Sequence, residues 1–182
     1  MSFVAVALGV AGGWNRGRTI RVGLSGLALL AALCLAACRS APEPRDYTPV
    51  VARFFLESAS GDGTPLTLPQ SGVRVAVNPK PVIAEGDIIN VELVQVDLGK
   101  CLLFQLSTSA IRDFYRMTVT HQGRRLVLVL DGDALGARRI DGPITNGVLY
   151  VFVERPEADL PALVQNLKKS SAAIQRELAR KG

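Results

Sequence analysis

Histidine is almost absent from this chain of 182 residues, which has only His121. A site built on two or more histidines, such as the common zinc-protease arrangement, is therefore excluded. Cysteine is scarce as well, with three in the whole chain, so a small scaffold held together by several disulfides is also excluded.

Acidic residues are missing from the first 37 positions, where Arg16, Arg18 and Arg21 fall. The whole chain has 21 Lys and Arg against 16 Asp and Glu. Once those three arginines are set aside, 18 basic residues face 16 acidic ones, and the remainder carries only +2. Nucleic acid is therefore not an expected partner, because its binding relies on a strongly basic surface.

The apolar run from Val22 to Ala37 follows these arginines and is shorter than the roughly 20 residues that span a bilayer. Basic residues before a short apolar run are the pattern of a secretory signal. Its end, Leu35-Ala36-Ala37-Cys38, resembles the lipobox of bacterial lipoproteins. The resemblance implies cleavage between Ala37 and Cys38, acylation of the Cys38 thiol and, usually, acylation of the new amine. An uncleaved anchor and an ordinary signal peptide with a chance cysteine are the alternatives.

A protein acylated in this way sits on a membrane without spanning it, because each buried methylene contributes about 0.8 kcal/mol. Arg39 follows the cysteine, whereas an Asp at that place favours inner-membrane retention in enterobacterial lipoproteins. The resemblance thus implies a lipid-anchored domain that faces the periplasm, with the outer membrane favoured over the inner. We expect a signal peptide at 1–37, a Pro-rich tether at 38–49 and a single domain at 50–182.

Apolar runs bounded by Gly, Pro, Asn and Asp predict strands within the domain. They fall at residues 50–56, 73–77, 88–96, 101–106, 125–130 and 148–153, with turns at 61–63, 69–72, 78–81, 97–99 and 131–133. The strand at 125–130 is predicted to be buried on both faces. Cys101 begins another apolar run, so we expect a buried, unreactive thiol.

Two helices are predicted. Ser107 or Thr108 caps the first, which runs through Thr118 and places Phe114 in the same core as Leu128. Asp159 caps the second, whose apolar stripe comprises Leu160, Leu163, Val164, Leu167, Ile174 and Leu178. The basic residues of this last helix form either a solvated face or a contact with anionic lipid or nucleic acid.

The order of strands, helix, strands and helix predicts an α+β fold. We expect a ferredoxin-like arrangement, in which two helices pack on one face of a mainly antiparallel sheet that has an N-terminal strand extension.

A family resemblance covers roughly residues 91–167. A Gly-Arg pair at 123–124 precedes an apolar strand that runs into Leu130-Asp131-Gly132, and Ala137, Ile140, Pro143-Ile144 and Gly147 follow. This pattern resembles the periplasmic head subdomain of SecD-type protein-export subunits. Two features depart from that family: residues 151–156 replace its Gly-x-Phe-Thr segment, and no membrane-spanning run follows the signal.

The resemblance implies a module that holds or guides extended polypeptide through strand edges and apolar grooves. Proton-driven export needs ionisable groups inside a membrane, so this chain alone is not expected to be an export motor. A structural lipoprotein that packs in an envelope assembly is the alternative function.

Candidate catalytic and metal-binding residues give weak patterns. Asp131-Gly132-Asp133, with Asp141 nearby, lacks the closing Glu of a calcium loop, so a hairpin turn is expected. His121 has no nucleophile or acid partner in the sequence, and we expect a solvated loop residue. Gly61-Asp62-Gly63 lacks the Lys-Ser of a phosphate loop. We therefore expect no enzyme activity, no cofactor, no metal and no small-molecule substrate, and a protein partner.

Overall fold

Eight strands and two α-helices make up the part of the chain that the computed structural model describes, residues 46–181. The strands are β1 Ala52–Glu57, β2 Thr64–Thr67, β3 Arg74–Ile83, β4 Ile88–Val96, β5 Gly99–Leu106, β6 Arg125–Leu130, β7 Asp133–Arg139 and β8 Val148–Val151. The helices are α2 Thr108–Thr120 and α3 Leu160–Lys181, with 3-10 turns η1 Glu85–Asp87 and η2 Glu157–Asp159. The signal segment and the predicted lipobox lie outside the described residues.

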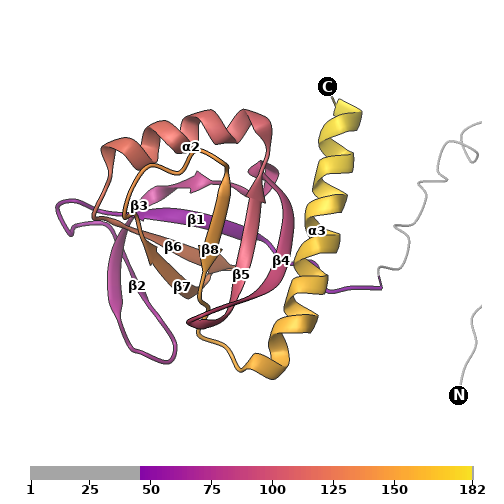
Figure 1. Cartoon of the computed structure of the whole chain (residues 1–182), viewed down its shortest axis with the longest axis horizontal. Helices are drawn as coiled ribbons and strands as arrows, with labels where there is room; N and C mark the ends of the chain where they lie inside the picture. The colour runs from indigo at the N-terminus through magenta and orange to yellow at the C-terminus, as the bar shows by residue number, and fades with distance from the viewer. Residues whose placement is uncertain (1–45, 182) are drawn as a thin grey trace, which may run out of the picture. The chain divides into compact units, whose positions relative to one another are not determined.

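The strands form two antiparallel sheets (Figure 1). Sheet A has the order β2-β3-β1-β6-β7, and sheet B has the order β4-β5-β8. The two sheets meet where β7 passes the end of β8, and there the Glu154 N–H donates to the Leu135 carbonyl at 2.7 Å. Gly136 makes this approach possible, because a Cβ at that position would lie 2.3 Å from the Phe152 carbonyl oxygen.

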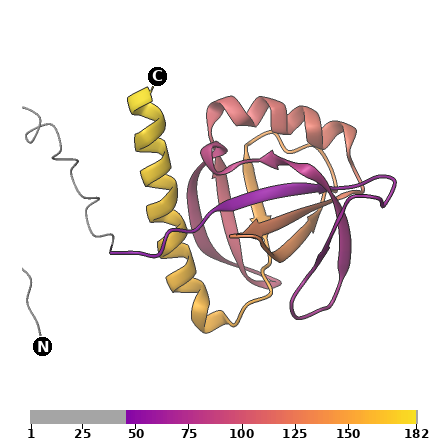
Figure 2. The ribbon, with the colours of Figure 1, turned by 180° about the vertical axis from the view of Figure 1, so that it is seen from behind.

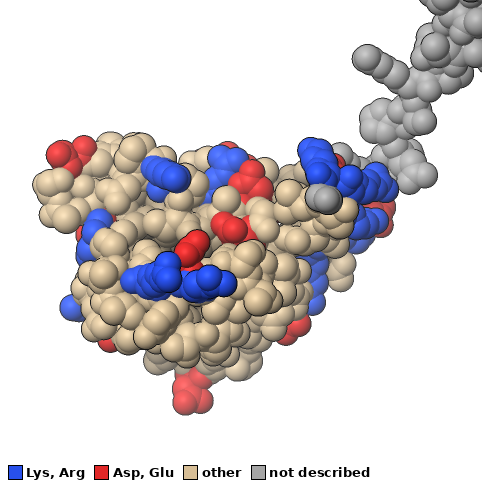
Figure 3. All heavy atoms as spheres, turned by 90° about the horizontal axis from the view of Figure 1, so that it is seen from above, with Lys and Arg blue, Asp and Glu red and all other residues tan. Residues whose placement is uncertain are grey.

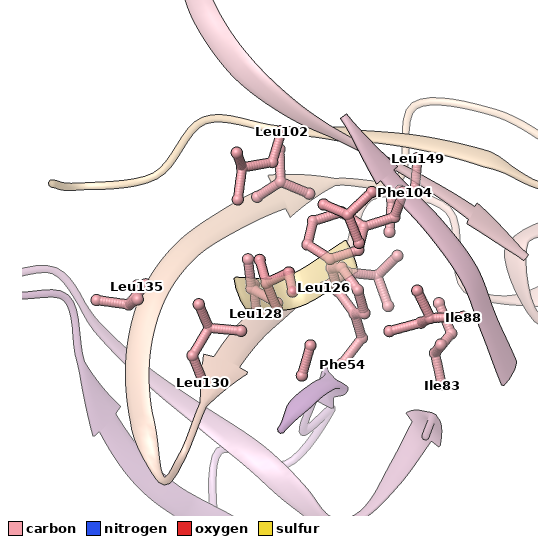
Figure 4. Close-up of a cluster of buried hydrophobic side chains, with 14 of the residues drawn as sticks. Phe54, Ile83, Ile88, Leu102, Phe104, Leu126, Leu128, Leu130, Leu135 and Leu149 are labelled. Carbon is pink, nitrogen blue, oxygen red and sulfur yellow. The ribbon is translucent and has the colours of Figure 1, made fainter. Parts of the chain in front are cut away.

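One core fills the space between the two sheets (Figure 4). Alternate residues of β1, β6 and β5 point into it: Phe54 and Leu56, Leu126, Leu128 and Leu130, and Leu102, Phe104 and Leu106. The rings of Phe54 and Phe104 meet edge to face across the core, with 5.1 Å between their centroids. Such a pair contributes about 0.5–1.5 kcal/mol beyond its buried area.

The strands predicted at 88–96 and 125–130 are confirmed with the same bounds. β6 is buried on both faces, as predicted, because the β2–β3 hairpin covers its outer side with a second apolar cluster that includes Val75, Val127 and Val129. The turn predicted at 78–81 is wrong: these residues belong to β3, which pairs first with β2 and then with β1. Register shifts in the β1–β3 ladder accommodate the prolines of β3.

The ferredoxin-like arrangement is not confirmed, although the α+β class and the antiparallel pairing are. The strands divide between two sheets rather than forming one, because β2 and β7, which the sequence did not predict, extend sheet A. The helices do not share one sheet face: α2 lies across the strand ends, whereas α3 runs along β4 (Figures 1 and 2).

Both predicted helices are present. Ser107 caps α2 by accepting a hydrogen bond from the Ala110 N–H, and Phe114 is buried in the core with Leu128, as predicted. In α3 the residues Leu160, Leu163, Val164 and Leu167 are buried. The predicted stripe does not continue to Leu178, which is 48% exposed.

Candidate functional site

The predicted site residues Ala37 and Cys38 lie outside the described residues. The last residues of the predicted tether are described, and they lie against α3. Asp46 pairs with Lys169 at 2.6 Å, the Thr48 N–H donates to the Asn166 side-chain oxygen at 3.3 Å, and the Val50 N–H donates to Ser170 Oγ at 2.9 Å. The chain therefore enters the domain along the middle of α3.

Asp131 and Gly132 form the hairpin turn between β6 and β7, as predicted. Their φ angles of 51° and 105° lie in the left-handed region that such turns use. The Asp131 carboxylate accepts a hydrogen bond from the Val51 N–H at 2.8 Å, so it ties the turn to the chain before β1. Asp141 faces Arg139 at 4.0 Å on the surface.

His121 is the residue at which α2 ends. Its Nδ1 lies 2.9 Å from the Met117 carbonyl oxygen and 3.0 Å from Thr120 Oγ1, both on its own helix. Within residues 46–181, no three His, Cys, Asp or Glu side chains are grouped so that they could hold a metal ion. The predicted solvated-loop position is thus refined: His121 closes the end of a helix.

Cys101 is buried, as predicted. Burial raises the pKa of its thiol, which the positive charge of Arg138 offsets only in part. A thiol in this environment stays protonated near neutral pH and is a weak nucleophile.

The outer face of sheet A carries an apolar hollow. Two adjoining hollows of about 240 and 440 Å³ share Phe55, Val129 and Gly132. The first is walled by Leu66 of β2 and by Val77 of β3. We call this combined hollow the sheet A groove.

Contacts between distant parts of the chain shape the sheet A groove. The β2–β3 hairpin covers part of the outer face of sheet A. Glu154 holds the loop between β2 and β3 by accepting hydrogen bonds from the Gln70 N–H at 2.7 Å, the Ser71 N–H at 2.9 Å and Ser71 Oγ at 2.6 Å. Desolvation alone would raise the pKa of Glu154, but these hydrogen bonds outweigh it and leave that pKa below its usual value. Glu154 therefore stays charged near neutral pH and keeps its hydrogen bonds to this loop.

An ion pair lies at the open end of the sheet A groove. Arg53 donates two hydrogen bonds to Glu85, at 2.7 and 2.9 Å. These bonds lower the pKa of Glu85 to about 2, so the pair stays charged at neutral pH. The groove thus combines an apolar floor with a polar rim.

Sequence reasoning did not identify the residues of this groove. Phe55 alternates with the buried Phe54, which is a signal for an outward-facing aromatic side chain. β2 gave no such signal, because it is only four residues long and contains a proline. The predicted strand at 148–153 presents two large exposed apolar side chains, Tyr150 and Phe152.

Known structures share this fold. One is the crystal structure of SecDF in its super-membrane-facing form, with a TM-score of 0.54 and 17% identity, over 65% of this chain and 18% of that chain. Another is a structure of SecDF, a membrane component that enhances protein export, with a TM-score of 0.53 and 17% identity, over 81% of this chain and 70% of that chain.

No family model matches the sequence, and a search of curated proteins finds no match. In the described part of the chain, no helix is both long and apolar enough to cross a membrane. At 17% identity the likeness is one of fold alone. The described domain therefore has the fold of a part of SecDF, in agreement with the resemblance to SecD-type subunits that its sequence predicts.

Proposed function

We propose that this protein is a lipid-anchored envelope protein that binds extended polypeptide, and that it assists protein export by contact rather than by catalysis. The observation that carries the proposal is the sheet A groove, an apolar hollow on a domain that has the fold of a part of SecDF. The anchor is the acylated Cys38, which puts the domain on the periplasmic side of a membrane, with the outer membrane favoured.

The groove suits short apolar stretches of an unfolded chain. Phe55, Leu66 and Val77 offer apolar contacts, and burying one large apolar side chain contributes about 1.5–3 kcal/mol. A single such anchor gives weak and reversible binding once the cost of association is subtracted. Weak binding fits a protein that holds a passing chain without trapping it.

Binding of a fluorescently labelled, permanently unfolded polypeptide, followed by anisotropy, tests this proposal. Leu66→Asp should weaken the binding at least tenfold, because it places a charge on the wall of the groove. Tyr150→Asp, which places the same charge at a more exposed position on sheet B, is the control and should leave the binding unchanged. Circular dichroism establishes that both variants are folded. Equal binding by the Leu66→Asp variant and the wild type would overturn the groove assignment.

A structural role in an envelope assembly is the second candidate. Tyr150 and Phe152, which are 40% and 41% exposed, favour it, because they place two aromatic side chains at the surface within three consecutive residues. Complementation of a deletion strain separates the two roles. Under polypeptide binding Leu66→Asp fails to complement, whereas under structural packing Tyr150→Asp fails.

The same strain tests for catalysis. His121→Ala and Asp133→Asn should both complement, because the proposed function uses neither side chain chemically. Loss of function in His121→Ala, in a protein that is still folded and lipidated, would mean that the protein works by catalysis or metal binding.

A further inference from the structure

From Lys168 to its end, α3 carries a concentration of positive charge. Lys168, Lys169, Arg176, Arg180 and Lys181 all fall there, against a single acid, Glu177. Figure 3 shows blue Lys and Arg atoms gathered at this end of the domain. The start of the same helix is different, since Glu157 and Asp159 precede it in η2.

Helix stability explains only part of this charge. Basic side chains favour a helix C-terminus because of its dipole, but the effect is confined to the last turn. It accounts for Arg180 and Lys181. It does not account for Lys169 and Arg176, which lie on the same face as Arg180 because they are spaced by seven and four residues.

Most of this charge is free to meet a partner. Arg176, Arg180 and Lys181 are exposed, and none of the three forms a salt bridge with any residue between 46 and 181. Lys169 is the exception, because it binds Asp46, the point at which the tether reaches the domain. The basic face and the entry point of the tether are therefore side by side on α3.

We propose that the basic face of α3, defined by Lys169, Arg176 and Arg180 and extended at the end of the helix by Lys181, docks on the anionic phospholipid headgroups of the membrane that holds the anchor. This inference rests on the proposed lipidation of Cys38. It goes further by giving the domain a fixed orientation, with the C-terminal half of α3 toward the lipid.

Chain geometry permits this contact. Cys38 and Asp46 are eight positions apart, which limits the span between them to about 26–29 Å. The helix rises by about 18 Å between Lys169 and Lys181. Because this rise is smaller than the maximum span, the end of α3 can reach the surface of a membrane that holds Cys38.

The tether also makes weak contacts effective. A short link between the anchor and the domain raises the local concentration of the domain at the membrane, so little intrinsic affinity is needed. Each Lys or Arg near an anionic surface shifts the equilibrium about fivefold toward contact. Loss of three of them should reduce the docked population relative to the free one by about a hundredfold. The effect should also weaken as salt is raised, because screening shortens the reach of the charges to less than about 8 Å.

Energy transfer from tryptophan to a dansyl-labelled lipid headgroup measures this orientation. The chain has a single tryptophan, Trp14, in the predicted signal. After cleavage, Leu178→Trp is therefore the only tryptophan and reports on the basic end of α3. Leu98→Trp is the matched control, because Leu98 is 85% exposed and lies in the β4–β5 turn. The acylated protein is reconstituted in phosphatidylcholine vesicles and in vesicles with equal parts of phosphatidylcholine and phosphatidylglycerol.

In phosphatidylglycerol vesicles we expect stronger transfer from position 178 than from position 98. Arg176→Gln, Arg180→Gln and Lys181→Gln together should remove that difference, as should vesicles of phosphatidylcholine alone. A protein that floats with the vesicles but gives equal transfer from both positions overturns the docking and leaves the anchor intact. A protein that does not float overturns the anchor and, with it, this orientation.

Discussion

Replacing Leu128 with alanine removes three carbon atoms from the middle of the core between the two sheets. The Leu128 side chain is fully buried, opposite Phe54 on β1 and opposite Gly136 on β7. Loss of its transfer free energy alone costs about 2.4 kcal/mol, at about 0.8 kcal/mol for each carbon. The cavity left behind adds a second cost, which depends on how far the neighbours can collapse.

Collapse around Leu128 should be limited. Its neighbours are held by strand pairing on both sides, and Val151 fills the space beside Gly136, where a Cβ would lie 3.1 Å from the Val151 methyl carbon. We therefore expect Leu128→Ala to lower the free energy of unfolding by about 3–4 kcal/mol, within the range of buried leucine truncations. The melting temperature should fall by about 10–15 °C for a domain of this size.

Urea unfolding followed by far-ultraviolet circular dichroism measures this loss, with the chain expressed from residue 39 onward. Leu98→Ala is the matched control: the same atoms are removed at a position that is 85% exposed, so the cost should be close to zero. Phe114→Ala should cost about 3–5 kcal/mol, because α2 packs the ring of Phe114 into the same core. A cost below about 1 kcal/mol for Leu128→Ala would refute the assignment of β6 as a strand that is buried in this core.

Three further predictions concern the anchor, an ion pair and a strand crossing. Cys38→Ser should abolish acylation, whereas mass spectrometry of the wild type should show a diacylglyceryl cysteine at the mature N-terminus; a free thiol there would contradict the lipobox. Hydrogen bonds from Arg125 lower the pKa of Glu57 in the folded protein. The carboxylate therefore contributes to the free energy of unfolding at a pH above its pKa in the unfolded chain, and this contribution is lost as the pH falls through its pKa in the folded protein. Urea unfolding of Glu57→Gln should thus show a deficit of at most about 1 kcal/mol at pH 7 that disappears in acid, and a deficit independent of pH would be contrary to this reasoning. Gly136→Ala should destabilise the domain by more than about 2 kcal/mol, because the added Cβ collides with the Phe152 backbone. A near-wild-type melting temperature would show that β7 passes the Phe152 backbone less closely than described.

The sequence predicted those elements whose own residues carry a clear pattern. β4 and β6 are long apolar runs between turn residues, and Ser107 followed by Phe114 indicates a capped helix with a buried face. β7 was missed because its sequence, DALGARR, contains a glycine and two arginines and has little strand propensity. Its pairing with β6 and its close passage over β8 form it instead.

The sheet A groove could not be predicted for a related reason. Its wall depends on the position of the β2–β3 hairpin, which Glu154 fixes through Ser71, a residue 83 positions earlier in the chain. A single sequence contains no local signal for such a contact. The proposed lipobox differs in kind, because a lipidation motif consists of consecutive residues and stays a prediction of the sequence alone.

The contacts of residues 46–50 with α3 determine how this segment responds to a pulling force. A pull on the chain before Asp46 loads the bonds of this segment one after another: first Asp46 with Lys169, then Thr48 with Asn166, and then Val50 with Ser170. Peeling the first two contacts releases about four residues, which lengthens the link by about 14 Å before any strand carries the force. Under the lipidation of Cys38 that we propose, this segment is an extensible strap, through which the domain can move away from the membrane without unfolding.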